Sequence, residues 1–551
     1  MEVALLAGLT LIGVAVPDGI VTSIGQAASK WLRFYDRFAA RKFVPILALI
    51  LLCCLVRLSI LPWYPVPLPR VHDEFSLLLG AKTFALGRLT NPPHPLWIQM
   101  ETFHVLQQPT YVSIYPPAQA AMLAVGILLG NPWLAILACA GLVCGAFAWA
   151  LRAWFSPGWA LCGGILLFTK TILTYWSDSY WGGTLAALAA AIVAGAAGRI
   201  WFGREARWRH GWLLGIGIAI LVNRRPLEGS LLVLGLAIMI GYWLLRKAQR
   251  PLRPTVLRIV LPGLAVLIPC AAFIGYYDMR ATGNPLLMPY VKGIETYGIA
   301  RHDILLPATP EPAYRNPEFR EFYRIEYEYY LERRRHPFAS LFEPLLRSWT
   351  LYLGPSLSLP LLLMARRIWS SRNIRPILYI LIGCLAINCT ETWILPHYIA
   401  PVLPLVWIVV VESLVLLVSL GSRWSRAVAI ASIMSCLFGG TSLIFSRVLR
   451  NIHQDVGWPR SQVVDKIARI PGKHLIFVKY LPGHYVSEEW VYNEPDIDSS
   501  AIVWVRDLGP DLNAQCLRYF AGRRIWEAEV GDTLKRLTQI TRPEVLEAHY
   551  P

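Results

Sequence analysis

Long apolar runs recur through most of this 551-residue chain, and they limit its fold more than any other feature. Hydrophobic residues make up 55% of the chain and charged residues only 16%, a balance that excludes an ordinary soluble protein. Each run approaches the ~20 residues that cross a bilayer as a helix. We therefore expect an α-helical polytopic membrane protein with about 11 transmembrane helices. The runs are 43–63, 133–151, 158–176, 181–202, 211–223, 229–245, 256–277, 341–364, 374–391, 394–420 and 425–448.

Basic residues gather in every second connection between these runs, and this alternation predicts the orientation of the chain. The connections rich in arginine and lysine are expected in the cytoplasm. The opposite connections and the tail after Arg450 then lie on the outer side of a cytoplasmic (inner) membrane. The formal net charge of +17 is explained by this pattern, and no basic-aromatic groove points to nucleic acid. The outer connections are 64–132, 177–180, 224–228, 278–340 and 392–393.

Three parts are expected along the chain. Residues 1–42 form an N-terminal cytoplasmic or interfacial segment, in which the apolar piece Val3–Val16 fits either an interfacial helix or an extra span. Residues 43–450 form the transmembrane domain, with large outer loops at 64–132 and 278–340. Residues 451–551 form a small extracytoplasmic α/β domain. Its expected strands are 473–480, 501–508 and 524–530, and its expected helix is 511–520.

The tail contains no glycine-rich nucleotide-binding motif, and the ten cysteines contain no pair at metal-ligand spacing. We therefore expect neither a zinc site nor a disulfide framework.

Two adjacent carboxylates, Asp73 and Glu74, follow the first confident span. They would be costly in lipid, so they must face water or a protein cavity. The apolar spacing beyond them, to Leu89, favours a helix lying on the membrane surface. We interpret this as the active-site segment, with a catalytic base or a cation ligand. The alternative is a pair of solvated acids matched by Arg70 or Lys82.

A third acid, Asp178, lies in a short outer turn between aromatic residues and paired glycines, which permit close approach of a ligand. Asp73 and Asp178 together could hold a divalent cation, Mg²⁺ or Mn²⁺, or divide the roles of base and positioning group. The alternative for Asp178 is an acid that only keeps the turn solvated.

Arg224 and Arg225 are adjacent on the outer side, against the usual charge bias. A lipid phosphate would account for them, although Glu228 could simply neutralise one arginine. His397 and Tyr398, at the start of a late span, could donate hydrogen bonds to the same phosphate. The alternative for His397 is a residue that only packs inside the protein.

The long first loop is rich in proline, histidine, glutamine and tyrosine, and long ordered loops are usually functional. Its candidates for positioning donor or acceptor are His94, Gln108, Tyr111 and Tyr115.

The acid pair behind the first span, the acid in the next outer turn and the late His-Tyr-x-x-Pro segment at 397–401 resemble the GT-C glycosyltransferases. The branch that they resemble most includes the protein O-mannosyltransferases and the lipid A aminoarabinose transferases, in a bacterial form. The resemblance covers roughly residues 43–450. One departure is the lack of a strict DxD motif in the second loop.

The resemblance implies inverting transfer of a sugar from a polyprenyl-phosphate donor to a saccharide, lipid or protein acceptor outside the cytoplasm. Asp73 would act as the base, and Glu74 or Asp178 would orient the acceptor or bind a cation. Arg224 and Arg225, helped by His397, would stabilise the departing phosphate. The alternative is a transporter or flippase of lipid-linked saccharide, but such proteins usually contain internal repeats, and none is evident.

Overall fold

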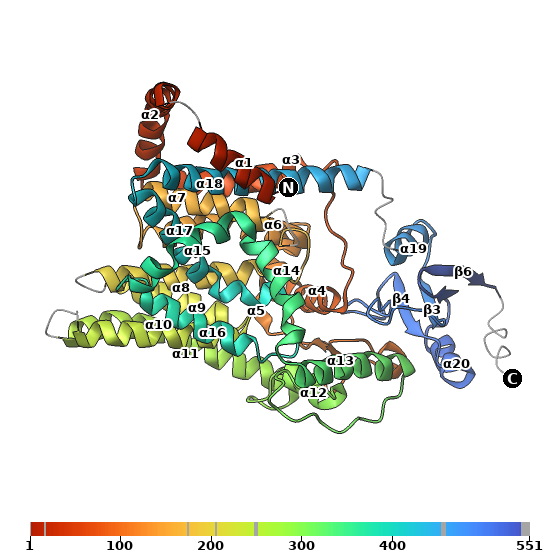
Figure 1. The fold of residues 1–551 in the computed structure, drawn as a ribbon. Helices are drawn as coiled ribbons and strands as arrows, with labels where there is room; N and C mark the ends of the chain where they lie inside the picture. The colour runs from red at the N-terminus through yellow and green to blue at the C-terminus, as the bar shows by residue number, and fades with distance from the viewer. Residues whose placement is uncertain are drawn as a thin grey trace.

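The structure is a computed structural model that describes residues 2–15, 18–172, 176–203, 207–246, 252–452 and 459–541. Most of the chain is helical. Most helices of the main bundle lie along roughly one axis, and the C-terminal domain lies beyond one end of that bundle (Figure 1). The bundle helices are α3 (Val44–Ser59), α6 (Pro132–Leu151), α7 (Pro157–Leu167), α8 (Thr184–Phe202), α9 (Trp208–Val222), α10 (Pro226–Arg246), α11 (Leu252–Thr282), α14 (Phe342–Tyr352), α15 (Gly354–Ser370), α16 (Arg375–Asn388), α17 (Leu403–Ser419) and α18 (Arg423–Ile452).

Length and composition identify the helices that can cross a membrane. Within the described residues four helices pass this test, namely α6, α8, α10 and α11, and a fifth is added if the bent pair formed by residues 29–40 and α3 is one span. The chain is thus an integral membrane protein. Shorter apolar helices, among them α9, α16 and α17, accompany these four, and the number of eleven spans stays a prediction.

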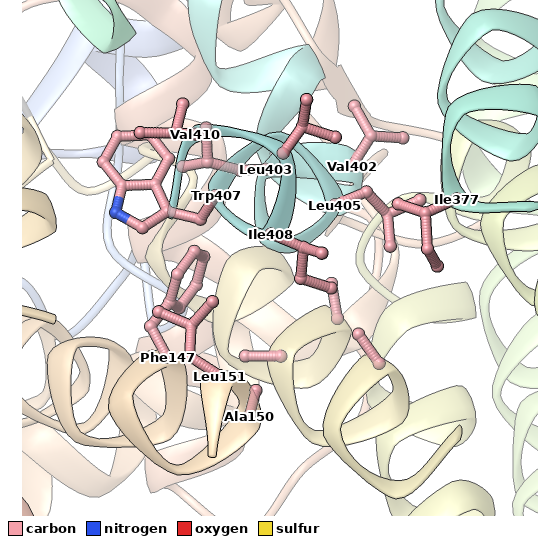
Figure 2. Packing of buried hydrophobic residues seen from close by; sticks show 14 of the residues in the cluster. Phe147, Ala150, Leu151, Ile377, Val402, Leu403, Leu405, Trp407, Ile408 and Val410 are labelled. Atoms are coloured by element: carbon pink, nitrogen blue, oxygen red, sulfur yellow. The ribbon is translucent and has the colours of Figure 1, made fainter. Parts of the chain in front are cut away.

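The core of the bundle surrounds α17, which is buried on most of its surface because its residues are apolar all round. In Figure 2 Trp407 and Ile408 of α17 point toward Phe147 and Leu151 of α6. The indole of Trp407 also donates a 2.9 Å hydrogen bond to the Gly163 carbonyl. The neighbouring helix α8 is rich in buried alanine, and such small side chains let helices approach closely in a membrane.

One expected span, 341–364, is wrong as a continuous helix. The helix breaks between α14 and α15, where Gly354 adopts a φ of +60°. Gly354 tolerates this left-handed conformation, and Pro355 can begin a new helix but cannot continue an old one. The expected run 394–420 likewise begins as a 3₁₀ helix, η4 (Pro396–Val402), before α17.

The two long loops, 64–132 and 278–340, contain regular structure. The first loop holds α4 (His72–Ala85), a 3₁₀ turn η1 (Trp97–Met100), a two-stranded hairpin of β1 (Val105–Leu106) and β2 (Val112–Ser113), and α5 (Pro117–Leu128). The second loop holds α12 (Pro289–Tyr297), α13 (Pro317–Arg335) and the short η3 (Ala339–Leu341).

The prediction that the acid-pair segment lies on the membrane surface is wrong. Helix α4 is buried from Glu74 to Ala81, because α5, the β1–β2 hairpin and the C-terminal domain cover it. Lys82 and Arg88 contact acids of that domain, Glu494 and Asp496, instead of lipid headgroups. The apolar spacing along α4 therefore matches protein neighbours and not a bilayer.

At the other end of the chain, α1 (Glu2–Ala15) packs along α18 and α15. The Glu2 carboxylate accepts a 3.2 Å hydrogen bond from Lys170 in the π-helical turn η2 (Phe168–Ile172), and another from the Ser356 hydroxyl. The apolar piece at the N-terminus is thus packed against the bundle. Helix α2 (Asp18–Ala40) follows it.

The C-terminal part forms a four-stranded mixed sheet in the order β4-β3-β5-β6, which confirms the expected α/β character. Strand β3 pairs in parallel with both β4 and β5, and β6 pairs antiparallel to β5. The elements are α19 (Pro459–Ala468), β3 (His474–Tyr480), β4 (Ile502–Arg506), α20 (Pro510–Tyr519), β5 (Arg524–Val530) and β6 (Leu534–Ile540).

Arg506, at the end of β4, ties this domain to both outer loops. It is almost fully buried and forms ion pairs with Glu489 of its own domain and, at 3.4 Å, with Glu318 of α13. Its Nε also donates a 3.0 Å hydrogen bond to the carbonyl of Glu101 in the first loop. In a second contact the ring of Tyr492 stacks on that of Phe75 in α4, with 4.3 Å between the ring centres.

We predict that Arg506→Met loosens the domain from the outer loops. Removing one partner of a buried ion pair costs about 3–5 kcal/mol, because the other charge stays buried. Limited proteolysis in membranes should cut the tail faster than in the wild type, while Arg518→Met, which changes an exposed arginine of the same domain, should not. Equal cleavage rates in the two variants would contradict this role.

Candidate active site

Asp73 is the second residue of α4, where the amide groups of a helix N-terminus favour a negative charge. Its Oδ1 accepts a 2.7 Å hydrogen bond from His104 Nδ1 and another from the Tyr115 hydroxyl. His72 Nε2 lies 3.5 Å from the same oxygen. The carboxylate is thus held in one orientation by groups from α4 and the first loop.

The backbone at His104 is strained to make this contact. Its φ is +58°, in the left-handed region that non-glycine residues seldom adopt. Such a conformation costs about 1–3 kcal/mol and persists where surrounding contacts enforce it, often at functional sites. Here the contacts are those of the imidazole with Asp73 and Tyr115.

The charges around Asp73 favour its ionised form. Burial acts to raise the pKa of Asp73, but the rings of His72 and His104 and the Tyr115 hydroxyl outweigh it and hold this pKa well below its usual range. Burial and the neighbouring His104 lower the pKa of His72 to about 4. The pKa of His104 is raised, because its contact with Asp73 overcomes its burial.

A second set of side chains converges on Asp73 from other elements. The Tyr115 ring lies 6.5 Å from that of Tyr290 on α12. Burial raises the pKa of the Tyr290 hydroxyl well above 10. Tyr398, Glu326 and Asp73 raise this pKa further, whereas the positive charge of Arg225 lowers it. Charged and polar groups that shift the pKa of one hydroxyl must lie near that hydroxyl. The first loop, α12, α13, η4 and the α9–α10 connection therefore meet at one site.

Arg224, at the connection of α9 and α10, is buried with neutral partners. Its Nε donates to Gln119 Oε1 at 3.1 Å, and its Nη2 donates to the carbonyls of Trp181 (2.6 Å) and Gly182 (3.3 Å). Burial and the adjacent Arg225 lower its pKa to about 9, while Tyr115, Glu228 and Tyr398 oppose that shift. Among the ion pairs between described residues, none joins Arg224 to a carboxylate.

Arg225 differs from Arg224, because its charge is matched. Its Nη1 pairs with Glu228 at 3.3 Å, and its guanidinium lies 4.0 Å from the centre of the Tyr398 ring. His397 is buried between Trp181 and Tyr398, with ring distances of 4.7 and 4.9 Å. Arg225, Tyr398 and His397 thus lie side by side at the start of α10 and in η4.

Glu74 points away from Asp73. Its carboxylate accepts hydrogen bonds from the backbone amides of Arg70 (2.8 Å), Val71 (3.4 Å) and Tyr180 (2.9 Å). It therefore joins the start of α4 to the turn that carries Asp178.

Asp178 has partners on α3 and in the segment that follows it. Its Oδ1 pairs with the buried Arg57 of α3 at 3.3 Å, and its Oδ2 accepts a 2.8 Å hydrogen bond from Tyr64. The face of Trp133 lies 4.8 Å from the Arg57 guanidinium. Asp178 thus neutralises a charge on a bundle helix.

Of the first-loop candidates, Tyr115 alone contacts Asp73. His94 Nε2 lies 3.1 Å from Asp498, and the Tyr111 hydroxyl donates to the Asn493 carbonyl at 2.9 Å. Both therefore bind the C-terminal domain. Gln108 is exposed in the turn of the β1–β2 hairpin.

One group among the described residues has metal-ligand spacing, namely His72, Asp73 and His104, whose donor atoms lie within 4.8 Å of one another. It includes Asp73 but not the other predicted ligand, Asp178. Two imidazoles and one carboxylate fit Mn²⁺ or Zn²⁺ better than Mg²⁺, which prefers oxygen ligands.

The sequence analysis missed His72, His104, Tyr290 and Glu326. Glu326 is half-buried on α13, one turn after Phe322, whose ring lies 5.9 Å from that of His104. Burial raises the pKa of Glu326 to about 7, with His104 and Asp73 acting in opposite directions. The buried positions 319, 322, 323 and 330 follow a helical period, and Glu326 falls on the same face. This pattern could have marked Glu326 as an acid on the inner face.

The structure was compared with known proteins. It is similar to the crystal structure of ArnT from Cupriavidus metallidurans in the apo state, with 16% identity, a TM-score of 0.48 and coverage of 88% of this chain and 93% of that one. The crystal structure of the same protein bound to undecaprenyl phosphate matches with 13% identity, a TM-score of 0.48 and coverage of 88% and 92%. ArnT belongs to the lipid A aminoarabinose transferase branch that the sequence resembles. No family model and no curated protein sequence matches the chain.

We predict that Asp178→Asn destabilises the fold, since Arg57 would keep a buried charge without an ionised partner. The loss should be about 3–5 kcal/mol. Thermal unfolding in detergent micelles measures it, with Asp465→Asn as the control at an exposed acid. If Asp178→Asn unfolds like the wild type, the carboxylate is not a structural partner of Arg57, and a direct role in binding or catalysis is favoured instead.

Proposed function

We propose that this chain is an integral-membrane glycosyltransferase that moves a sugar from a polyprenyl-phosphate donor to an acceptor outside the cytoplasm, with inversion at the anomeric carbon. The support comes from its own side chains, together with the resemblance of its acid pair and late His-Tyr segment to the GT-C enzymes.

The buried charge of Arg224 carries the proposal. A buried guanidinium surrounded by neutral acceptors is costly unless an anion approaches it. Its location beside Tyr115 and Tyr398 puts this charge near the Asp73 carboxylate. A positive site for a phosphate and a fixed carboxylate are the two groups that glycosyl transfer from a sugar phosphate requires.

The polyprenyl chain of the donor stays in the lipid, and its phosphate lies against Arg224, with Arg225, His397 and Tyr398 around it. As the bond between the anomeric carbon and the phosphate oxygen breaks, its electron pair adds charge to the phosphate. The positive charge of Arg224, fixed in place by the protein, would stabilise that developing charge. A phosphate is a good leaving group without protonation.

The acceptor hydroxyl attacks the opposite face of the anomeric carbon. Asp73 accepts its hydrogen bond and then its proton as the new glycosidic bond forms. A carboxylate with a lowered pKa is a weak base in the ground state, but the proton is transferred late, when the hydroxyl has become acidic. Asp73 can therefore act both as the base and as the group that orients the acceptor. His104 and Tyr115 keep the carboxylate directed at the acceptor.

A divalent cation is a separate part of the proposal. His72, Asp73 and His104 would hold it, and when bound it would supply positive charge for the phosphate or for the acceptor oxygen. Orientation of the acceptor, transfer of its proton and stabilisation of the phosphate are assigned to the protein's side chains and do not depend on this cation.

The test is to incubate the purified protein in lipid nanodiscs with a panel of polyprenyl-phosphate sugars and candidate acceptors, with and without a chelator. Release of polyprenyl phosphate together with a glycosylated acceptor supports the proposal. Movement of a lipid-linked saccharide across a vesicle membrane without its consumption would instead favour the transporter.

We expect Asp73→Asn and Arg224→Met to lower turnover by different routes. Asn cannot accept the proton, and loss of a general base typically costs ~10²–10⁴-fold. Arg224→Met removes charge that stabilises the leaving phosphate, at a cost of about 2.7–4 kcal/mol of barrier, and it should also weaken binding of polyprenyl phosphate.

Both variants should remain folded, as thermal unfolding would show. The matched control is Arg315→Met, an arginine that is 54% exposed in the second loop. Turnover by Asp73→Asn equal to that of the wild type would remove this carboxylate from its role.

A further inference from the structure

Helix α2 runs across the bundle instead of along it. Its last part, residues 29–40, makes an angle of 99° with α3. Figure 1 shows α2 crossing the direction of α3, α7 and α18 at the end of the bundle away from the C-terminal domain. Because the bundle helices cross the membrane, a helix at right angles to them at their ends lies parallel to the bilayer plane.

Hydrogen bonds to the bundle hold α2 in this orientation. Arg152, at the end of α6, donates from Nη1 to the Lys42 carbonyl (2.8 Å) and from Nη2 to the carbonyls of Arg41 (2.7 Å) and Ala39. The Tyr35 hydroxyl donates to the Gly158 carbonyl of α7 at 2.8 Å. One side of the helix is thus used for the protein, and the opposite side faces outward.

Aromatic side chains cover part of the outward side. Trp31 is 75% exposed and Phe34 is 64% exposed, and their rings lie edge to face at 6.4 Å. Two large exposed rings on one helix are costly in water, whereas the boundary of headgroups and acyl chains is their favoured location.

Basic side chains cover the rest. Five of them and one acid, Asp36, occur between residues 30 and 42, so this stretch carries a formal charge of +4. At helical spacing Lys30, Arg33, Arg37 and Arg41 fall on one stripe beside the aromatic pair, and all of them are exposed. A cationic stripe next to an apolar stripe complements a layer of negative headgroups above acyl chains.

We propose that residues 29–42 form a binding surface for anionic phospholipid, in the leaflet at the end of the bundle opposite the C-terminal domain. Trp31 and Phe34 enter the headgroup boundary, and the basic stripe contacts lipid phosphates. This surface is separate from the proposed phosphate site at Arg224, so it stands or falls independently of the transfer reaction.

The first test uses lipid retention. The delipidated full-length protein is incubated with equal amounts of phosphatidylglycerol and phosphatidylcholine, and bound lipids are counted by native mass spectrometry. Each basic residue near an anionic surface contributes about fivefold in affinity. The combined substitution Arg33→Gln, Arg37→Gln and Arg41→Gln should therefore lower retention of phosphatidylglycerol by about tenfold or more, and retention of phosphatidylcholine should hardly change.

The matched control replaces three exposed arginines elsewhere, Arg320, Arg324 and Arg347, by glutamine. It removes the same charge and should retain phosphatidylglycerol like the wild type. An equal loss in both triple variants would mean that only net charge matters and would overturn the proposal.

A second measurement needs no variant. Hydrogen exchange of residues 29–42 in the wild type should be slower in nanodiscs that contain phosphatidylglycerol than in nanodiscs of phosphatidylcholine alone, and raising the salt concentration should remove most of the difference. Equal exchange in the two lipids would refute the surface. It would leave a protein partner as the occupant of the exposed rings.

Discussion

A charge buried in a membrane protein is stable only beside a partner, and this constraint determines several contacts that hold the loops and the bundle together. Arg57 is matched by Asp178, Arg225 by Glu228, and Arg506 by Glu489. The first and third pairs join segments that are separate in the chain, and the second lies at the start of α10. Arg224 stands apart, because its described partners are neutral acceptors. The same rule that explains the fold thus identifies the point at which an anion would be stabilised.

Helix α4 links the chemistry to the C-terminal domain. Asp73 at its start belongs to the candidate site, and Phe75, two residues later, stacks on Tyr492. The guanidinium of Arg460 in α19 also lies over the Phe75 ring, 5.0 Å from its centre. The position of the carboxylate therefore depends on packing against the domain as well as on His104 and Tyr115.

Much of this arrangement could be predicted from local patterns. Apolar runs predict most of the bundle helices, and short runs rich in valine and isoleucine predict the strands of the C-terminal sheet. The acid pair identified the segment of the candidate site, because two carboxylates directly after a span are costly in lipid and must face water or a protein cavity.

The sequence could not show which acid has which partner. Asp73 and Glu74 are neighbours, yet one faces His104 and the other accepts three backbone amides. Their difference arises from tertiary contacts with residues 31 to 106 positions away. The broken span at Gly354 and the burial of α4 also depend on neighbours far along the chain. Helical periodicity contains no information about such neighbours.

The late position of the C-terminal sheet in the chain has a consequence for biogenesis. Strand β6 ends at residue 540, so the ribosome has made every bundle helix before the C-terminal sheet can be complete. Until then Phe75 and its neighbours have no aromatic cover on that side. A chain interrupted during synthesis would carry every bundle helix into the membrane and still leave the Asp73 helix only partly enclosed.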